Sequence, residues 1–97
     1  MPLTNREKDA KIQSFQDRKD AIQATFDSRD VNNVRASLGD MKSLLGEMQT
    51  FLNSGELNAA NATQKAKLER LQKDCDKLEV NMTAMVEASH KAKTKRF

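Results

Sequence analysis

Apolar residues in the last third of the chain recur in alternating steps of three and four. Charged residues fill nearly every position between them. This pattern is typical of a helix that buries one narrow stripe against other helices. Since a narrow stripe is not buried by one helix alone, we expect the preceding chain to supply its partners. The series is Leu57, Asn61, Gln64, Leu68, Leu71, Cys75, Leu78, Met82 and Met85.

Two earlier stretches show the same helical spacing. The first follows a capping-box sequence at residues 4–7, which predicts a helix start there. Its stripe is thin and consists of Ile12, Phe15, Ile22 and Phe26, with Lys19 between them. The second stripe is wider, because Leu44 and Phe51 flank one side of its main series. That series is Val31, Val34, Leu38, Met41, Leu45, Met48 and Leu52.

Two short polar segments separate the three stretches. Residues 27–30 hold several potential N-cap side chains, and residues 53–55 end in glycine, which favours a helix end. Short connections make neighbouring helices run antiparallel. We therefore predict an all-α fold, an antiparallel up-down-up three-helix bundle with heptad-type packing. The helices are expected at about residues 5–26, 30–53 and 57–87, within one domain of residues 1–87. Asn58 and Asn61 are alternative caps at the start of the third helix, but the continuous stripe from Leu57 favours the earlier start.

Composition supports this fold class and places the excess charge at one end. The 97 residues include only three Gly and one Pro and no Trp or Tyr, which argues against a sheet. The formal charge of +3 comes from a basic tail at residues 88–97, and the remaining body is close to neutral. A neutral body is not typical of a nucleic-acid-binding domain. Binding of nucleic acid or an anionic membrane through the tail stays as an alternative; its cations are Lys91, Lys93, Lys95 and Arg96.

The sequence offers no constellation for catalysis, a metal or a cofactor. Cys75 lies in the apolar stripe, which predicts a buried and inert thiol. His90 is about 22 Å away along a straight helix, too far for a Cys–His pair. Acidic residues alternate with lysines rather than pairing on an apolar face. We expect a protein that is not an enzyme, takes no small-molecule substrate and has no secretory signal or membrane span. The single cysteine suits a cytoplasmic protein.

Residues 34–79 resemble a BAG domain, the three-helix module that binds the ATPase domain of the major heat-shock chaperone. The resembling segments are residues 34–38, 44–48, 65–72 and 76–79. The resemblance implies a co-chaperone that promotes nucleotide release and contacts its partner through the outer faces of helices two and three. Lys65 and Gln72 match the contact pattern of the family, whereas Gln64 stands in place of an arginine. Gly39 and Gln49 stand in place of acidic residues.

A second resemblance is to the N-terminal helical domain of Vti-type SNARE proteins. It is carried by residues 44–48 followed by residues 65–68 at nearly the same distance. This resemblance implies a regulatory domain in vesicle trafficking, with the basic tail as the linker to a following membrane-anchored segment.

Both resemblances favour a protein-interaction module over an enzyme. We expect the partner to be another protein, and the BAG resemblance implies a heat-shock chaperone. Self-association also stays open, because the thin stripe of the first helix leaves room for a second chain to complete the core. The residues expected to bind the partner are Lys42, Gln49, Gln64, Lys65 and Gln72.

Overall fold

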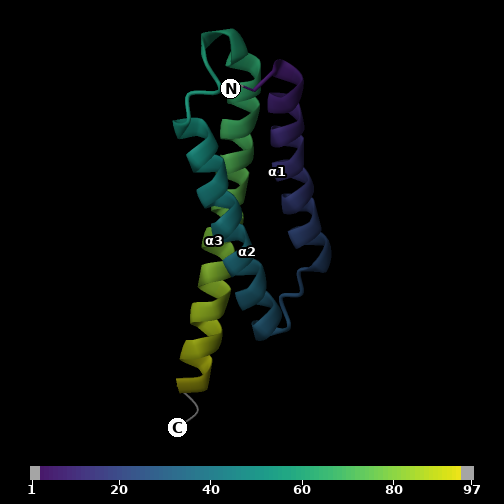
Figure 1. Cartoon of the computed structure of the whole chain (residues 1–97). Helices are drawn as coiled ribbons and strands as arrows, with labels where there is room; N and C mark the ends of the chain where they lie inside the picture. The colour runs from purple at the N-terminus through teal and green to yellow at the C-terminus, as the bar shows by residue number, and fades with distance from the viewer. Residues whose placement is uncertain (1–2, 95–97) are drawn as a thin grey trace.

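Three helices account for most of the molecule. The computed structural model describes the backbone of residues 3–94 and the side chains of residues 3–89. The helices are α1 (Asn5–Thr25), α2 (Val31–Asn53) and α3 (Ala62–Thr94), with a short 3-10 turn, η1 (Ala59–Asn61), before α3. This described part contains no strand, so the all-α prediction is confirmed. Figure 1 shows the helices packed side by side as a bundle 58 Å long and 20 Å wide.

The capping residues read from the sequence begin and end the first two helices. Thr4 and Glu7 form a reciprocal capping box, with bonds of 3.1 and 3.0 Å between each backbone N–H and the other side chain. The Asp30 carboxylate caps α2 by accepting backbone N–H bonds from its first turn. Gly55 follows the C-cap of α2 with a φ of +81°, a conformation that glycine adopts without strain. Local side-chain chemistry therefore sets these boundaries.

The third helix begins later than predicted. We expected helix from residue 57, but α3 starts at Ala62. The Asn58 side chain accepts the backbone N–H of Ala60, and the Asn58 N–H donates to Asn61 Oδ1. These two bonds satisfy a separate turn, η1, so the helical ladder starts after it. Leu57 is buried although it lies outside any helix. At the other end, the helical backbone continues to Thr94, beyond the predicted end at 87.

The buried face of α2 is rotated from the face that the main series predicted. Of the predicted flank, Leu44 is fully enclosed and Phe51 is buried. Val34, Met41 and Met48 of the main series are buried as predicted, whereas Leu38, Leu45 and Leu52 are only half-buried. The reason is that α2 packs against two helices. The Phe51 ring meets the Phe15 ring of α1 edge-on, with ring centroids 6.2 Å apart. The residues predicted as a flank therefore lie between both neighbours and form the centre of the core.

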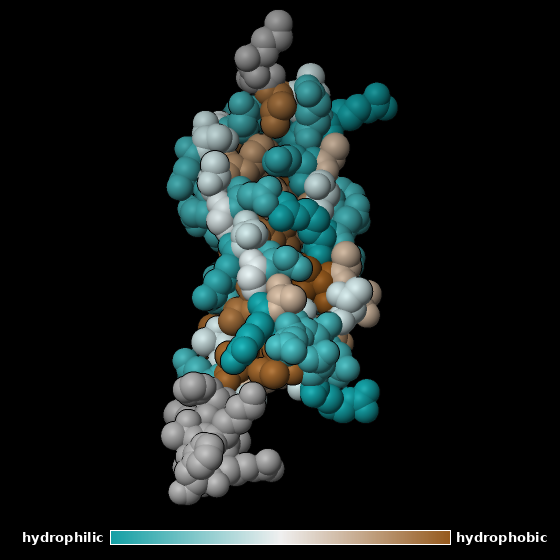
Figure 2. All heavy atoms as spheres, turned by 60° about the horizontal axis from the view of Figure 1, so that its bottom comes forward, coloured by the Kyte–Doolittle hydropathy of each residue, from teal (hydrophilic) through white to brown (hydrophobic). Residues whose placement is uncertain are grey.

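The stripes of α3 and α1 lie largely where the spacing placed them. In α3 the buried residues are Leu68, Leu71, Cys75 and Met82, while Leu78 is half-buried. The stripe ends at Met85, which is 40% exposed. In α1 the buried apolar residues are Ile12, Phe15 and Ile22. Figure 2 shows apolar side chains reaching the surface along one face between polar flanks, with most of them in the lower half of the view.

Candidate protein-binding face

Two of the predicted partner-binding residues touch each other across the boundary between α2 and α3. Gln72 Nε2 on α3 donates to Gln49 Oε1 on α2 at 2.7 Å. Gln49 Nε2 in turn donates to Asn53 Oδ1, one helical turn along α2, at 3.0 Å. Each glutamine is thereby held in one orientation. The pair marks the line where the two helices meet at the surface.

Two predicted lysines lie on the same side of the molecule. Lys42 precedes Gln49 by two helical turns on α2, and Lys65 precedes Gln72 by two turns on α3, so each shares the face of its glutamine. Both lysine side chains are exposed. We refer to this surface as the α2–α3 face; it consists of Lys42, Gln49, Lys65 and Gln72 together with the half-buried Leu38, Leu45 and Leu52.

The leucines of this face were assigned to the core by sequence pattern. Leu45 and Leu52 lie one turn before and one turn after Gln49, on the side of α2 that meets α3. They pack against the core with one edge and face solvent with the other. The heptad spacing of Leu38, Leu45 and Leu52 was the available signal, but spacing alone does not tell a central stripe from one at its edge.

Gln64 is directed away from the α2–α3 face. Its Nε2 donates to Asp9 Oδ1 at 2.6 Å and to the Asn5 backbone carbonyl at 3.3 Å, both on α1. Its Oε1 accepts a bond from Asn61 Nδ2. Gln64 therefore joins α3 to α1, and the structure does not bring it together with the other four predicted residues.

A buried lysine lies beside Gln64 and was not anticipated. Lys8 is 6% exposed, and its Nζ donates to Asn61 Oδ1 at 3.0 Å. Asn61 is also buried and bonds the Asn5 side chain through Nδ2 at 3.1 Å. A signal was present, since Lys8 lies one turn before Ile12 and thus on the apolar stripe of α1. A charged residue at a stripe position next to a buried amide indicates an internal polar contact.

The described side chains show little reactive chemistry. Cys75 is fully enclosed, as the stripe predicted, and burial raises the pKa of its thiol to about 11 by disfavouring the thiolate. Among the residues that the structure describes, no three His, Cys, Asp or Glu side chains cluster in a way that could hold a metal ion. Within the same part of the chain, no helix is long and apolar enough to cross a membrane.

The basic tail lies outside the described side chains. The structure gives the backbone of Lys91 and Lys93 as the end of α3 but not their side chains, and Lys95 and Arg96 are beyond the described residues. The predicted role of the tail in nucleic-acid or membrane binding stays a prediction.

Comparison of the chain with protein-family models, curated proteins and solved structures found no match.

Proposed function

We propose that the chain is a non-enzymatic protein-interaction module that binds its partner through the α2–α3 face. In this proposal the bundle is antiparallel, up-down-up, with heptad-type packing between helices. The observation that carries the proposal is the composition of the face. A line of half-buried leucines, Leu38, Leu45 and Leu52, runs beside the hydrogen-bonded Gln49–Gln72 pair.

This composition matches the general organisation of protein interfaces. Such interfaces combine apolar contacts at the centre with polar groups around them. Here the leucines supply apolar edges, while Lys42 and Lys65 supply exposed cations and the Gln49–Gln72 pair supplies fixed amide groups. All of them stand on regular helices, so the face is presented in one shape. A preformed surface loses less entropy on binding than a flexible one.

A heat-shock chaperone ATPase domain is the first partner to test. The BAG resemblance matches Lys65 and Gln72, and both belong to the α2–α3 face. Gln64, in place of the family's arginine, is bonded to α1, so the partner would contact Lys65 and Gln72 without it. The surface offered to a chaperone is therefore more neutral than the family pattern, and the half-buried leucines contribute correspondingly more of the affinity.

The experiment mixes the chain with a heat-shock ATPase domain and follows release of a fluorescent nucleotide. Accelerated release at tens of micromolar supports the co-chaperone role. The variant Lys65→Glu should reduce the effect about tenfold, because it reverses a charge inside the face. Lys67→Glu is the matched control, since Lys67 is an exposed lysine of the same helix outside the face. No acceleration by the unmodified chain would overturn this choice of partner, and equal loss in both variants would overturn the choice of face.

The Vti-type resemblance gives a second candidate function, a regulatory domain in vesicle trafficking. The observation that favours it is the helical backbone of α3, which continues to Thr94 beyond the expected end of the bundle. A continuing helix suits a connection to a further helical segment. The reading frame of the natural gene provides the test: a heptad segment and a membrane anchor after Phe97 would support this candidate, and a stop codon there would reject it.

A further inference from the structure

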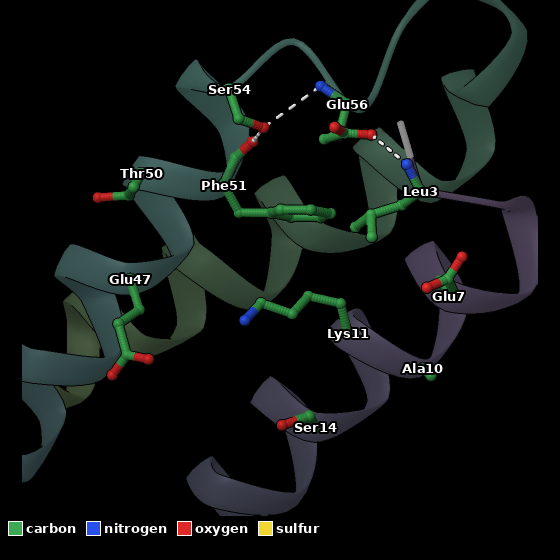
Figure 3. Close-up of a pocket in the computed structure, with 10 residues that line it drawn as sticks. All are labelled: Leu3, Glu7, Ala10, Lys11, Ser14, Glu47, Thr50, Phe51, Ser54 and Glu56. Carbon is green, nitrogen blue, oxygen red and sulfur yellow. Dashed lines mark hydrogen bonds between the residues drawn. The ribbon is translucent and has the colours of Figure 1, made fainter. Parts of the chain in front are cut away.

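A groove lies between α1 and α2 on a different side of the bundle from the α2–α3 face. It has a volume of about 850 Å³ and runs beside the first half of α1 and the last half of α2. Small side chains line its walls and leave the space between the two helices unfilled. In Figure 3 the Phe51 ring and the Leu3 side chain point toward each other and form its apolar part. The small wall residues are Ala10, Ser14, Thr50 and Ser54.

The rim of this α1–α2 groove is acidic. Glu7, Glu47 and Glu56 line it, and Lys11 is the one cation among the lining residues. Bonds from Thr4 hold the pKa of Glu7 below its usual value, and the Arg18 guanidinium at 2.7 Å does the same for the pKa of Glu47. Arg18 also neutralises part of the field of Glu47. The net charge of the rim is therefore negative, and it rests mainly on Glu7 and Glu56.

The sequence of the same chain contains a segment with the complementary character. Residues 91–97 hold four cations, no acidic residue and one aromatic residue, Phe97. The groove lies where α1 begins and α2 ends, whereas the described backbone of α3 ends at Thr94 at the opposite end of a molecule 58 Å long (Figure 1). Residues 95–97 span at most about 10 Å when fully extended, so a segment continuing from Thr94 does not reach the groove of its own chain, and the groove of a second copy is the one open to it.

We propose that residues 91–97 of one chain dock in the α1–α2 groove of a second copy. The cations would face the carboxylates of Glu7 and Glu56, and Phe97 would contact Phe51 and Leu3. Such a contact is heterologous, since groove and segment are different surfaces, so it adds chains head to tail without closing. The α2–α3 face stays uncovered in this arrangement, and the proposal does not depend on the proposed function.

The test is sedimentation of the full chain over a concentration series at low salt. We expect the mean mass to rise with concentration, with a dissociation constant on the order of 100 µM for so few exposed charge contacts. About 0.5 M NaCl should return the chain to a monomer by screening. A monomer at every concentration in low salt would overturn the proposal, as would association that salt leaves unchanged.

Charge substitutions identify the two surfaces. The rim variant Glu7→Gln/Glu56→Lys, which keeps a capping side chain at position 7, and the tail variant Lys93→Glu/Lys95→Glu should each associate at least about tenfold more weakly. Glu69→Lys, an exposed change on α3 away from the groove, is the control and should associate like the unmodified chain. Circular dichroism confirms that each variant is folded.

Mixing the rim variant with the tail variant tests directly whether these two surfaces bind each other. Rim-variant and tail-variant chains should associate with each other, because the unmodified tail of the rim variant meets the unmodified rim of the tail variant. Failure of the folded mixture to associate would overturn the pairing of these two surfaces, and so would full association of either variant alone.

Discussion

Two regions of the bundle differ in the kind of contact they make. The α2–α3 pair contributes mostly enclosed apolar side chains, whereas α1 adds fewer apolar residues and several polar bonds. The core-facing surfaces of α2 and α3 consist mainly of fully enclosed side chains, including Met41, Leu44, Met48, Leu68 and Cys75. From α1 come three buried apolar residues, Ile12, Phe15 and Ile22. Polar contacts also attach α1 to the other elements, such as the Lys8–Asn61 and Gln64–Asp9 bonds and the exposed Arg18–Glu47 pair.

The two kinds of contact have different effects. Apolar burial supplies most of the stability, and hydrogen bonds fix the relative positions of the helices. Apolar burial stabilises in proportion to area but is indifferent to small shifts between helices. A buried hydrogen bond contributes only about 1 kcal/mol net, yet losing its partner costs more, so it fixes which residues meet. We infer that α2 and α3 hold most of the stabilising burial, while the bonds of Lys8 and Gln64 fix the position of α1 along α3.

The largest expected loss of stability comes from truncating a core side chain of α2. Leu44→Ala should lower the free energy of unfolding by about 3–4 kcal/mol, because Leu44 is fully enclosed and its loss leaves a cavity. Urea denaturation followed by circular dichroism measures this. Ile22→Ala in α1 is the comparison and should cost less, about 2 kcal/mol, since Ile22 lies at the edge of the core. An equal or larger cost at Ile22 would contradict the distinction between the two regions.

A smaller loss of stability is expected when the hydrogen-bond acceptor of the buried Lys8 is removed. Asn61→Ala should cost about 2 kcal/mol, because the Lys8 ammonium then stays buried without this bond. Lys8→Met keeps the length of the side chain and removes the charge, so its cost should be within about 1 kcal/mol. The double variant Lys8→Met/Asn61→Ala should cost less than the sum of the two single variants. Additive costs would show that Lys8 and Asn61 do not act as a pair.

The smallest expected change in stability comes from ionisation of the buried Cys75 thiol at high pH. The folded pKa of Cys75 is raised to about 11, so the folded state keeps a proton that the unfolded chain loses near pH 9. The contribution of Cys75 is therefore complete below pH 9 and declines as the pH rises toward 11, by on the order of 1 kcal/mol at pH 10. Urea midpoints between pH 8 and 10.5 measure the decline.

Cys75→Ala is the control for this titration. It removes the thiol but leaves the lysines that titrate in the same range, so its midpoints should fall less steeply with pH than those of the unmodified chain. If the urea midpoints of both chains fell equally steeply with pH, burial in the core would not be what keeps the Cys75 thiol protonated.

The sequence predicted those features that depend on local chemistry and repeat spacing. Thr4 and Asp30 begin helices through bonds within a few residues, and Gly55 follows the end of α2 with a positive φ, so these boundaries could be predicted. The buried stripe of α3 from Leu68 to Met82 could also be predicted, because it faces both α1 and α2. The spacing of α2 did not distinguish Leu44 from Leu45, since the centre of that stripe depends on where α1 packs.

The candidate face was predictable only in part for the same reason. Lys42, Gln49, Lys65 and Gln72 follow from helical spacing once two helices are placed side by side. Gln64 differs because its orientation depends on Asn5 and Asp9, more than fifty residues earlier. The pairing of Lys8 with Asn61 has the same origin. Contacts between distant segments are what a repeat pattern does not encode.

The sequence separation of these contacts bears on how the chain is made and folds. The bond between Gln49 and Gln72 spans 23 residues, whereas that between Lys8 and Asn61 spans 53. Closing the shorter loop loses less chain entropy. Of the three helices α1 is synthesised first, yet Asn61 and Gln64, which bond it, lie more than fifty residues later, and a helix in a protein gains most of its stability from packing against others. We therefore expect α1 to reach its final position along α3 only after residues 61–64 have been added.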